Sequence, residues 1–157
     1  MFDTISGLPL HPLLVHAAVV FVPLLILVTL GYALVPRLRP RLDWAVVLLA
    51  VAAPAAVFAA RQSGLKFGQR LFGNRAWPAS VMRHEAYAKK LFWIALVFGV
   101  LALLLVALIE GRRRGKLNIP AAVTTLVLVL AVASAVPAGI YVYLTGDSGA
   151  TAVWNPK

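Results

Sequence analysis

The sequence contains no cysteine, and acidic side chains are scarce. The absence of cysteine excludes disulfides, thiolate metal sites, iron–sulfur clusters and covalently attached c-type haem. Five residues are Asp or Glu and fifteen are Lys or Arg, which gives a formal net charge of +10. Histidine occurs three times, at His11, His16 and His84, so any imidazole chemistry is confined to these positions.

The basic residues form short clusters between apolar runs, not one continuous basic face. Clusters of this kind are typical of loops that meet lipid headgroups. Nucleic-acid binding needs a basic patch or stripe, so we expect no nucleic-acid partner. The N-terminal segment MFDTISG has no Lys or Arg and therefore lacks the basic region of a signal peptide, and we expect it to be retained.

Apolar residues make up 62% of the 157 residues, more than a water-soluble domain of this size can bury. Four apolar runs are long enough to cross a hydrocarbon core of about 30 Å. They lack the alternation of barrel strands, and small residues between them favour close helix packing. We therefore predict an all-α integral membrane four-helix bundle, a single transmembrane domain over residues 1–157. Its spans are residues 13–35, 44–60, 91–109 and 119–144.

The connection between the second and third spans, residues 61–90, mixes apolar and basic residues. Its segment SGLKFGQRLFGNRAWP predicts a short amphipathic helix that lies in the membrane interface. Pro78 then suits the first position of the next helix.

Charge density in the loops predicts the orientation of the chain. The two short loops, PRLRPRLD and EGRRRGKLN, lie on one side and are dense in arginine. The 61–90 connection also carries seven basic residues, so the totals on the two sides are nearly balanced. Because short loops carry more weight in the positive-inside rule, we expect both termini outside the plasma membrane.

This topology places all three histidines at one membrane face, because the first and third spans both begin there. Ionisable groups at membrane depth usually face the bundle interior and are candidates for function. The alternative is structural: His11 is solvated, His84 caps a helix or lines the interface, and only His16 lies within the bundle, hydrogen-bonded to a neighbour. The ends of the second and fourth spans reach the same face, and the polar neighbours there are Arg61, Gln62, Ser63, Glu85, Thr145, Asp147 and Ser148.

Two kinds of bound group fit this cluster. A b-type haem needs two axial ligands on facing helices, which points to His16 and His84. Gln62, Glu85 and Asp147 would then orient the ligands. A transition metal such as zinc or copper would instead use His11, His16 and His84 with a carboxylate. This metal site is the weaker prediction, because residues five apart on a helix point about 140° apart.

The sequence LPLHPLLVHAAVVFVPL near the start and GDSGATAVW near the end resemble a family of small bacterial membrane proteins, catalogued as domain of unknown function 2231. The resemblance covers nearly the whole chain. Members often carry a histidine in the last turn, where Asp147 stands here, which leaves His16 and His84 as the expected pair. Fusion of some members to electron-transfer domains implies a redox role in a respiratory chain of the bacterial inner membrane.

We therefore expect a membrane protein with a histidine cluster that binds haem b or a metal for electron transfer, and we assign no catalytic residue. The alternative is a cofactor-free accessory or structural subunit of a larger membrane complex, and a proton or ion path through the same cluster is a third, weaker hypothesis. The expected partners are the lipid bilayer and either a larger membrane redox complex or further copies of this chain. The string Gly-Asp-Ser-Gly at 146–149 matches the nucleophile segment of trypsin-like proteases, but the protease needs a catalytic triad on a rigid scaffold. We interpret Gly146 as the end of the fourth helix.

Overall fold

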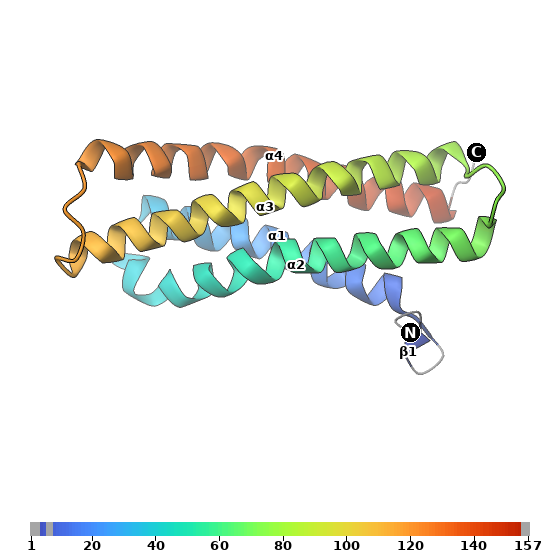
Figure 1. The fold of residues 1–157 in the computed structure, drawn as a ribbon, viewed down its shortest axis with the longest axis horizontal. Helices are drawn as coiled ribbons and strands as arrows, with labels where there is room; N and C mark the ends of the chain where they lie inside the picture. The colour runs from blue at the N-terminus through green and yellow to red at the C-terminus, as the bar shows by residue number, and fades with distance from the viewer. Residues whose placement is uncertain (1–3, 6–7, 155–157) are drawn as a thin grey trace.

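Four long helices run side by side along the longest axis of the computed structural model, which describes residues 4–5 and 8–154 (Figure 1). Each is long and apolar enough to cross a membrane, which confirms the all-helical membrane prediction. Two short antiparallel strands, β1 (Thr4–Ile5) and β2 (Leu8–Pro9), precede the first helix. The helices are α1 (Leu10–Leu34), α2 (Arg39–Phe72), α3 (Ala79–Arg113) and α4 (Ala121–Trp154), and a 3-10 turn, η1 (Pro36–Leu38), joins α1 to α2.

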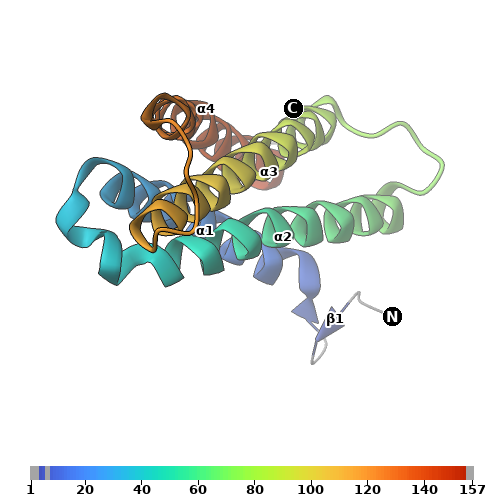
Figure 2. The same ribbon diagram turned by 60° about the vertical axis from the view of Figure 1, so that its left-hand side comes forward.

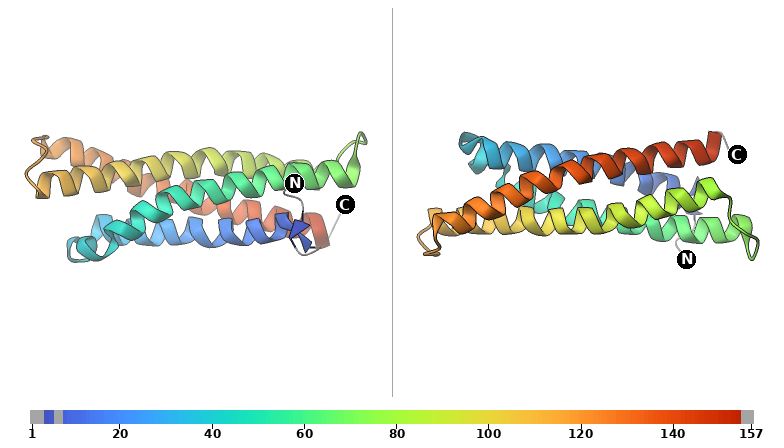
Figure 3. Two further views of the ribbon diagram at one scale, coloured as in Figure 1. Left: turned by 60° about the horizontal axis from the view of Figure 1, so that its bottom comes forward. Right: turned by 90° about the horizontal axis from the view of Figure 1, so that it is seen from above.

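Each helix packs against the next one in the chain, and α1 also packs against α4 (Figures 2 and 3). This arrangement places α1 diagonally opposite α3. We call the end that holds the start of α1, the end of α4 and the α2–α3 connection the histidine end. The opposite end, with η1 and the α3–α4 loop, is the arginine end.

The bundle core is apolar, and so is much of its outer surface. Val22, Leu25, Phe98 and Leu105 are fully buried at the centre. Large aliphatic side chains such as Leu27 point outward, as expected for a bundle whose surface meets lipid.

The predicted interfacial helix is not present among residues 61–90, all of which the structure describes. These residues instead extend α2 to Phe72 and begin α3 at Ala79, directly after Pro78. With 34 residues, α2 is about 51 Å long and exceeds the hydrocarbon core by several turns. Packing against neighbouring helices keeps the polar part of α2 helical, so the helix continues where its apolar run ends.

The fourth helix is also longer than predicted. It does not end at Gly146 but continues to Trp154. Both extensions lie at the histidine end, where α1 and α3 begin (Figure 1).

A proline and a glycine bring α2 and α3 close together near mid-bundle. Pro54 lies inside α2 and has no backbone N–H. The carbonyl of Ala50, four residues earlier, therefore receives no helical hydrogen bond from residue 54. Gly99 of α3 faces this carbonyl so closely that a Cβ there would lie 2.5 Å from the Ala50 oxygen. The helices can approach this far only because residue 99 has no side chain.

Candidate functional site

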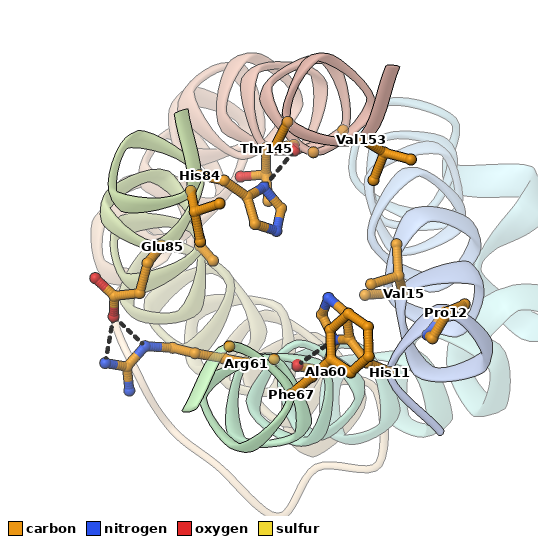
Figure 4. A pocket seen from close by; sticks show the side chains of 18 of the residues that line it. His11, Pro12, Val15, Ala60, Arg61, Phe67, His84, Glu85, Thr145 and Val153 are labelled. Atoms are coloured by element: carbon orange, nitrogen blue, oxygen red, sulfur yellow. Dashed lines mark hydrogen bonds and ion pairs between the residues drawn. The ribbon is translucent and has the colours of Figure 1, made fainter. Parts of the chain in front are cut away.

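A cavity of about 590 Å³ lies between all four helices at the histidine end (Figure 4). Its volume is in the range of small-molecule and cofactor sites. Most of its wall is apolar and includes Val15, Val57, Phe67, Leu91 and Val142.

His11 enters the cavity from α1 and is held by α2. Its Nδ1 lies 3.0 Å from the carbonyl oxygen of Ala60 and 3.1 Å from Oγ of Ser63. The Ser63 hydroxyl donates to the same carbonyl at 2.8 Å, so its oxygen is free to accept. A carbonyl only accepts hydrogen bonds, so the proton of the neutral imidazole resides on Nδ1.

His84 enters from α3 and is held by α4 in the same way. Its Nδ1 lies 3.0 Å from the carbonyl oxygen of Thr145 and 3.3 Å from Oγ of Ser148. The Ser148 hydroxyl donates to the Thr145 carbonyl at 3.1 Å. Both histidines therefore carry the proton on Nδ1 and present an unprotonated Nε2.

Each imidazole also packs against a glycine one residue after the serine. A Cβ at Gly64 would lie 2.8 Å from Cε1 of His11, and one at Gly149 would lie 3.0 Å from Cε1 of His84. The two hairpins, α1–α2 and α3–α4, thus build the same half-site. In each, the second helix supplies a carbonyl, a serine three residues later and a glycine four residues later.

The two half-sites face each other across the cavity. The ring centroids of His11 and His84 are 6.4 Å apart, with an interplanar angle of 72°. Figure 4 shows that the ring nitrogen of each histidine that is not bonded to a carbonyl points into the space between the rings. Phe67 stacks on His11 at a centroid distance of 6.1 Å and limits its movement.

An ion pair closes one side of the cavity. Arg61 of α2 donates through Nη2 to Oε1 of Glu85 on α3 at 2.7 Å, and through Nε at 3.2 Å. Figure 4 places this pair at the edge of the cavity between α2 and α3, away from the two imidazole rings. It ties the two hairpins together at the level of the histidines.

His16 does not face His84 as the sequence analysis expected. It borders the cavity but is exposed, and its Nδ1 donates to the Pro12 carbonyl of its own helix at 2.6 Å. The reason is helical phase: α1 begins at Leu10, so His11 is already helical, and His16 points about 140° away from it. His11 takes the position opposite His84.

The other predicted residues are divided between the site and the surface. Glu85 lines the cavity, whereas Gln62 and Asp147 are exposed. In the described part of the chain, no three His, Asp or Glu side chains come together in a group that could hold a metal ion. The three-histidine metal site is therefore not formed.

The sequence marks Ser63 and Ser148 as polar neighbours of the histidines without a role, and it does not single out Gly64 or Gly149 as part of the site. The available signal was the Ser-Gly pair, which occurs near the end of the second apolar segment (RQSG) and of the fourth (GDSG). Its recurrence at matching places in two hairpins indicates a repeated half-site.

One family model, described as "Predicted membrane protein (DUF2231)", matches residues 7–157. The match includes both half-sites. No curated protein and no solved structure matches the chain.

Proposed function

We propose that this chain, which belongs to the DUF2231 family of predicted membrane proteins, binds a b-type haem. The haem would lie in the cavity at the histidine end, between His11 and His84. Haem with two histidine ligands supplies one-electron transfer. The chain would then serve as an electron carrier in the membrane. One observation carries this proposal: the imidazoles of His11 and His84 are held in the same way, and the unprotonated nitrogen of each points into the space between the two rings (Figure 4).

The donor set fits such a group. A metal-bound histidine typically donates its other ring N–H to a carbonyl or carboxylate, which fixes the tautomer and the ring orientation. His11 and His84 both do so, with Ala60 and Thr145 as acceptors.

The separation of the rings also fits. A histidine nitrogen lies about 2 Å from a metal that it binds, so two histidines can hold one group only if their rings lie close together. The ring centroids of His11 and His84 are 6.4 Å apart, so both histidines would be near enough to hold the same haem.

The remaining residues of the site would bind the hydrophobic group, orient the two histidine rings and exclude water. The apolar wall suits a large, flat, hydrophobic molecule and keeps water from the histidines. Phe67, Gly64 and Gly149 hold the rings in place, while the Arg61–Glu85 pair closes the side between α2 and α3.

Optical spectroscopy of the purified protein tests the proposal. The protein is produced with haem in excess, and a reduced-minus-oxidised spectrum is recorded for the wild type, His11→Ala, His84→Ala and the matched control His16→Ala. We expect a b-type band in the wild type and in His16→Ala, and its loss in the other two variants. Circular dichroism and gel filtration verify that each variant remains folded.

Two results would overturn the proposal. One is a colourless wild-type protein that takes up no haem when titrated with it. The other is a band that survives in folded His11→Ala or His84→Ala.

A further inference from the structure

A second cavity, of about 350 Å³, lies at the arginine end, away from the histidine site. It opens between the start of α2, the end of α3 and the first turns of α4. Its polar lining consists of Arg39, Arg112, Arg113, Glu110 and Thr124. Three guanidinium groups and one carboxylate leave the cavity with a positive excess.

Two of the arginines are held in place by backbone carbonyls. Arg39 donates through Nε and Nη2 to the carbonyls of Tyr32 and Ala33, at 3.2 and 3.3 Å. Arg112 donates through Nη1 to the Ile119 carbonyl at 2.9 Å. A guanidinium has five N–H donors, so within the described residues both retain donors for an anion. Because the side chains are already ordered, binding an anion costs little conformational entropy.

Glu110 adds a buried acceptor oxygen that has no partner in the described part of the chain. It is only 8% exposed, and its Oε2 pairs with Arg113 at 2.8 Å. Its other oxygen, Oε1, is buried without a hydrogen-bond partner among the described residues, as is Oγ1 of Thr124. A buried acceptor without a donor is costly, so a ligand that brings a hydroxyl group beside its phosphate suits this cavity better than a simple anion.

The cavity lies at the level where lipid headgroups are expected. The apolar run of α3 ends at Ile109, directly before Glu110, and four more basic residues lie at the same end of the bundle: Arg37, Arg41, Arg114 and Lys116. Basic pockets between membrane helices are typical sites for anionic lipid headgroups.

We propose that this cavity binds a glycerol phosphate ester, as in the headgroup of phosphatidylglycerol. Arg39 and Arg112 donate to the phosphate, and Oε1 of Glu110 accepts from a headgroup hydroxyl. A soluble glycerol phosphate offers the same groups, so the experiment compares both sources. The proposal does not depend on haem binding at the histidine end.

The test titrates delipidated protein in non-ionic detergent and follows the unfolding temperature. We expect a saturable rise with phosphatidylglycerol and none with phosphatidylcholine. Phosphatidylethanol, which has the same phosphodiester but no headgroup hydroxyl, should bind more weakly because Glu110 then gains no donor. A separate titration with soluble glycerol phosphate, in the absence of lipid, identifies the source of the ligand. If it raises the unfolding temperature as much as phosphatidylglycerol does at the same concentration, the site is assigned to the soluble ester. If the rise is smaller, the site is assigned to the lipid.

Arg112→Gln removes a phosphate donor, and we expect it to weaken the affinity for phosphatidylglycerol about tenfold. The matched control is Arg37→Gln, an exposed arginine at the same end that does not line the cavity. An equal loss in both variants would mean that diffuse surface charge attracts the lipid, and it would overturn the proposal. The proposal would also be overturned if neither phosphatidylglycerol nor soluble glycerol phosphate gave a saturable rise in unfolding temperature. Equal affinity for phosphatidylethanol and phosphatidylglycerol would overturn it as well.

Discussion

The position of one proton on each imidazole decides what the histidine site can do. A serine hydroxyl alone would not fix it, because a hydroxyl can either donate or accept. The carbonyls of Ala60 and Thr145 accept only, and they hold the proton on Nδ1 of His11 and His84. The serines reinforce this choice by donating to the same carbonyls.

The close contact between His84 and Gly149 gives a test at the scale of one methyl group. Gly149→Ala would place a Cβ 3.0 Å from Cε1 of the ring, so the imidazole must shift. Changes to groups that orient a ligand typically cost 10- to 100-fold in affinity, and we expect a loss of about that size for haem in a titration followed by absorbance.

The control for Gly149→Ala is Gly139→Ala on the same helix, where, in the described part of the chain, a Cβ would meet only Cδ1 of Ile26 at 3.9 Å. We expect this variant to bind haem as the wild type does. Wild-type affinity in Gly149→Ala as well would show that the ring does not need this close approach.

Which residues gather at the site could be predicted only in part. Topology alone placed His11, His16 and His84 at one end of the bundle, and the structure agrees. It could not tell which histidine faces inward, because hydropathy does not fix where α1 starts or how it is rotated. His11 is helical because α1 begins at Leu10, three residues before the predicted span, and that rotation turns His16 outward.

The parts of the helices that are apolar enough to lie in lipid could be predicted from the sequence. Long apolar runs must be helical in a bilayer, so the four helices follow from composition. The ends of α2 and α4 did not follow, because beyond residues 60 and 144 both helices are maintained by packing rather than by lipid. Gly64 and Gly149, each pressed against a histidine ring, lie in these extensions.

The contact between Gly99 and Ala50 predicts that a side chain at position 99 disturbs the packing of α2 against α3 and destabilises the protein. In Gly99→Ala the new Cβ would lie 2.5 Å from the Ala50 oxygen, so α2 and α3 must separate. Overpacking of this kind typically destabilises a protein by about 1–3 kcal/mol. We expect a lower unfolding temperature in detergent for Gly99→Ala, measured by circular dichroism.

Gly146→Ala is the comparison for this variant, because no atom of the described residues lies within 4 Å of a Cβ at that helical position. Alanine has the higher helix propensity, so this variant should be as stable as the wild type or slightly more so. Equal stability of Gly99→Ala and Gly146→Ala would show that the two helices separate at no cost.

For the molecule as a whole, the lack of cysteine makes the orientation in the membrane easy to measure. Asn74, in the α2–α3 connection, and Asn118, in the α3–α4 loop, are both exposed and lie at opposite ends. From the density of arginine in the short loops, we expect Asn74→Cys to react with a membrane-impermeant maleimide in intact cells. Asn118→Cys should react only after the cells are permeabilised. The reverse pattern would place both termini in the cytoplasm.

The repeated half-site has a consequence for how the protein can be assembled. Each hairpin holds a histidine together with its carbonyl, serine and glycine, and the short segment between Phe72 and Ala79 is the covalent link between the two hairpins. Two fragments made separately, residues 1–74 and 75–157, would each carry a finished half of the cavity wall. Co-expressed in one membrane, they should find each other and restore the whole protein, as two subunits of a heterodimer would.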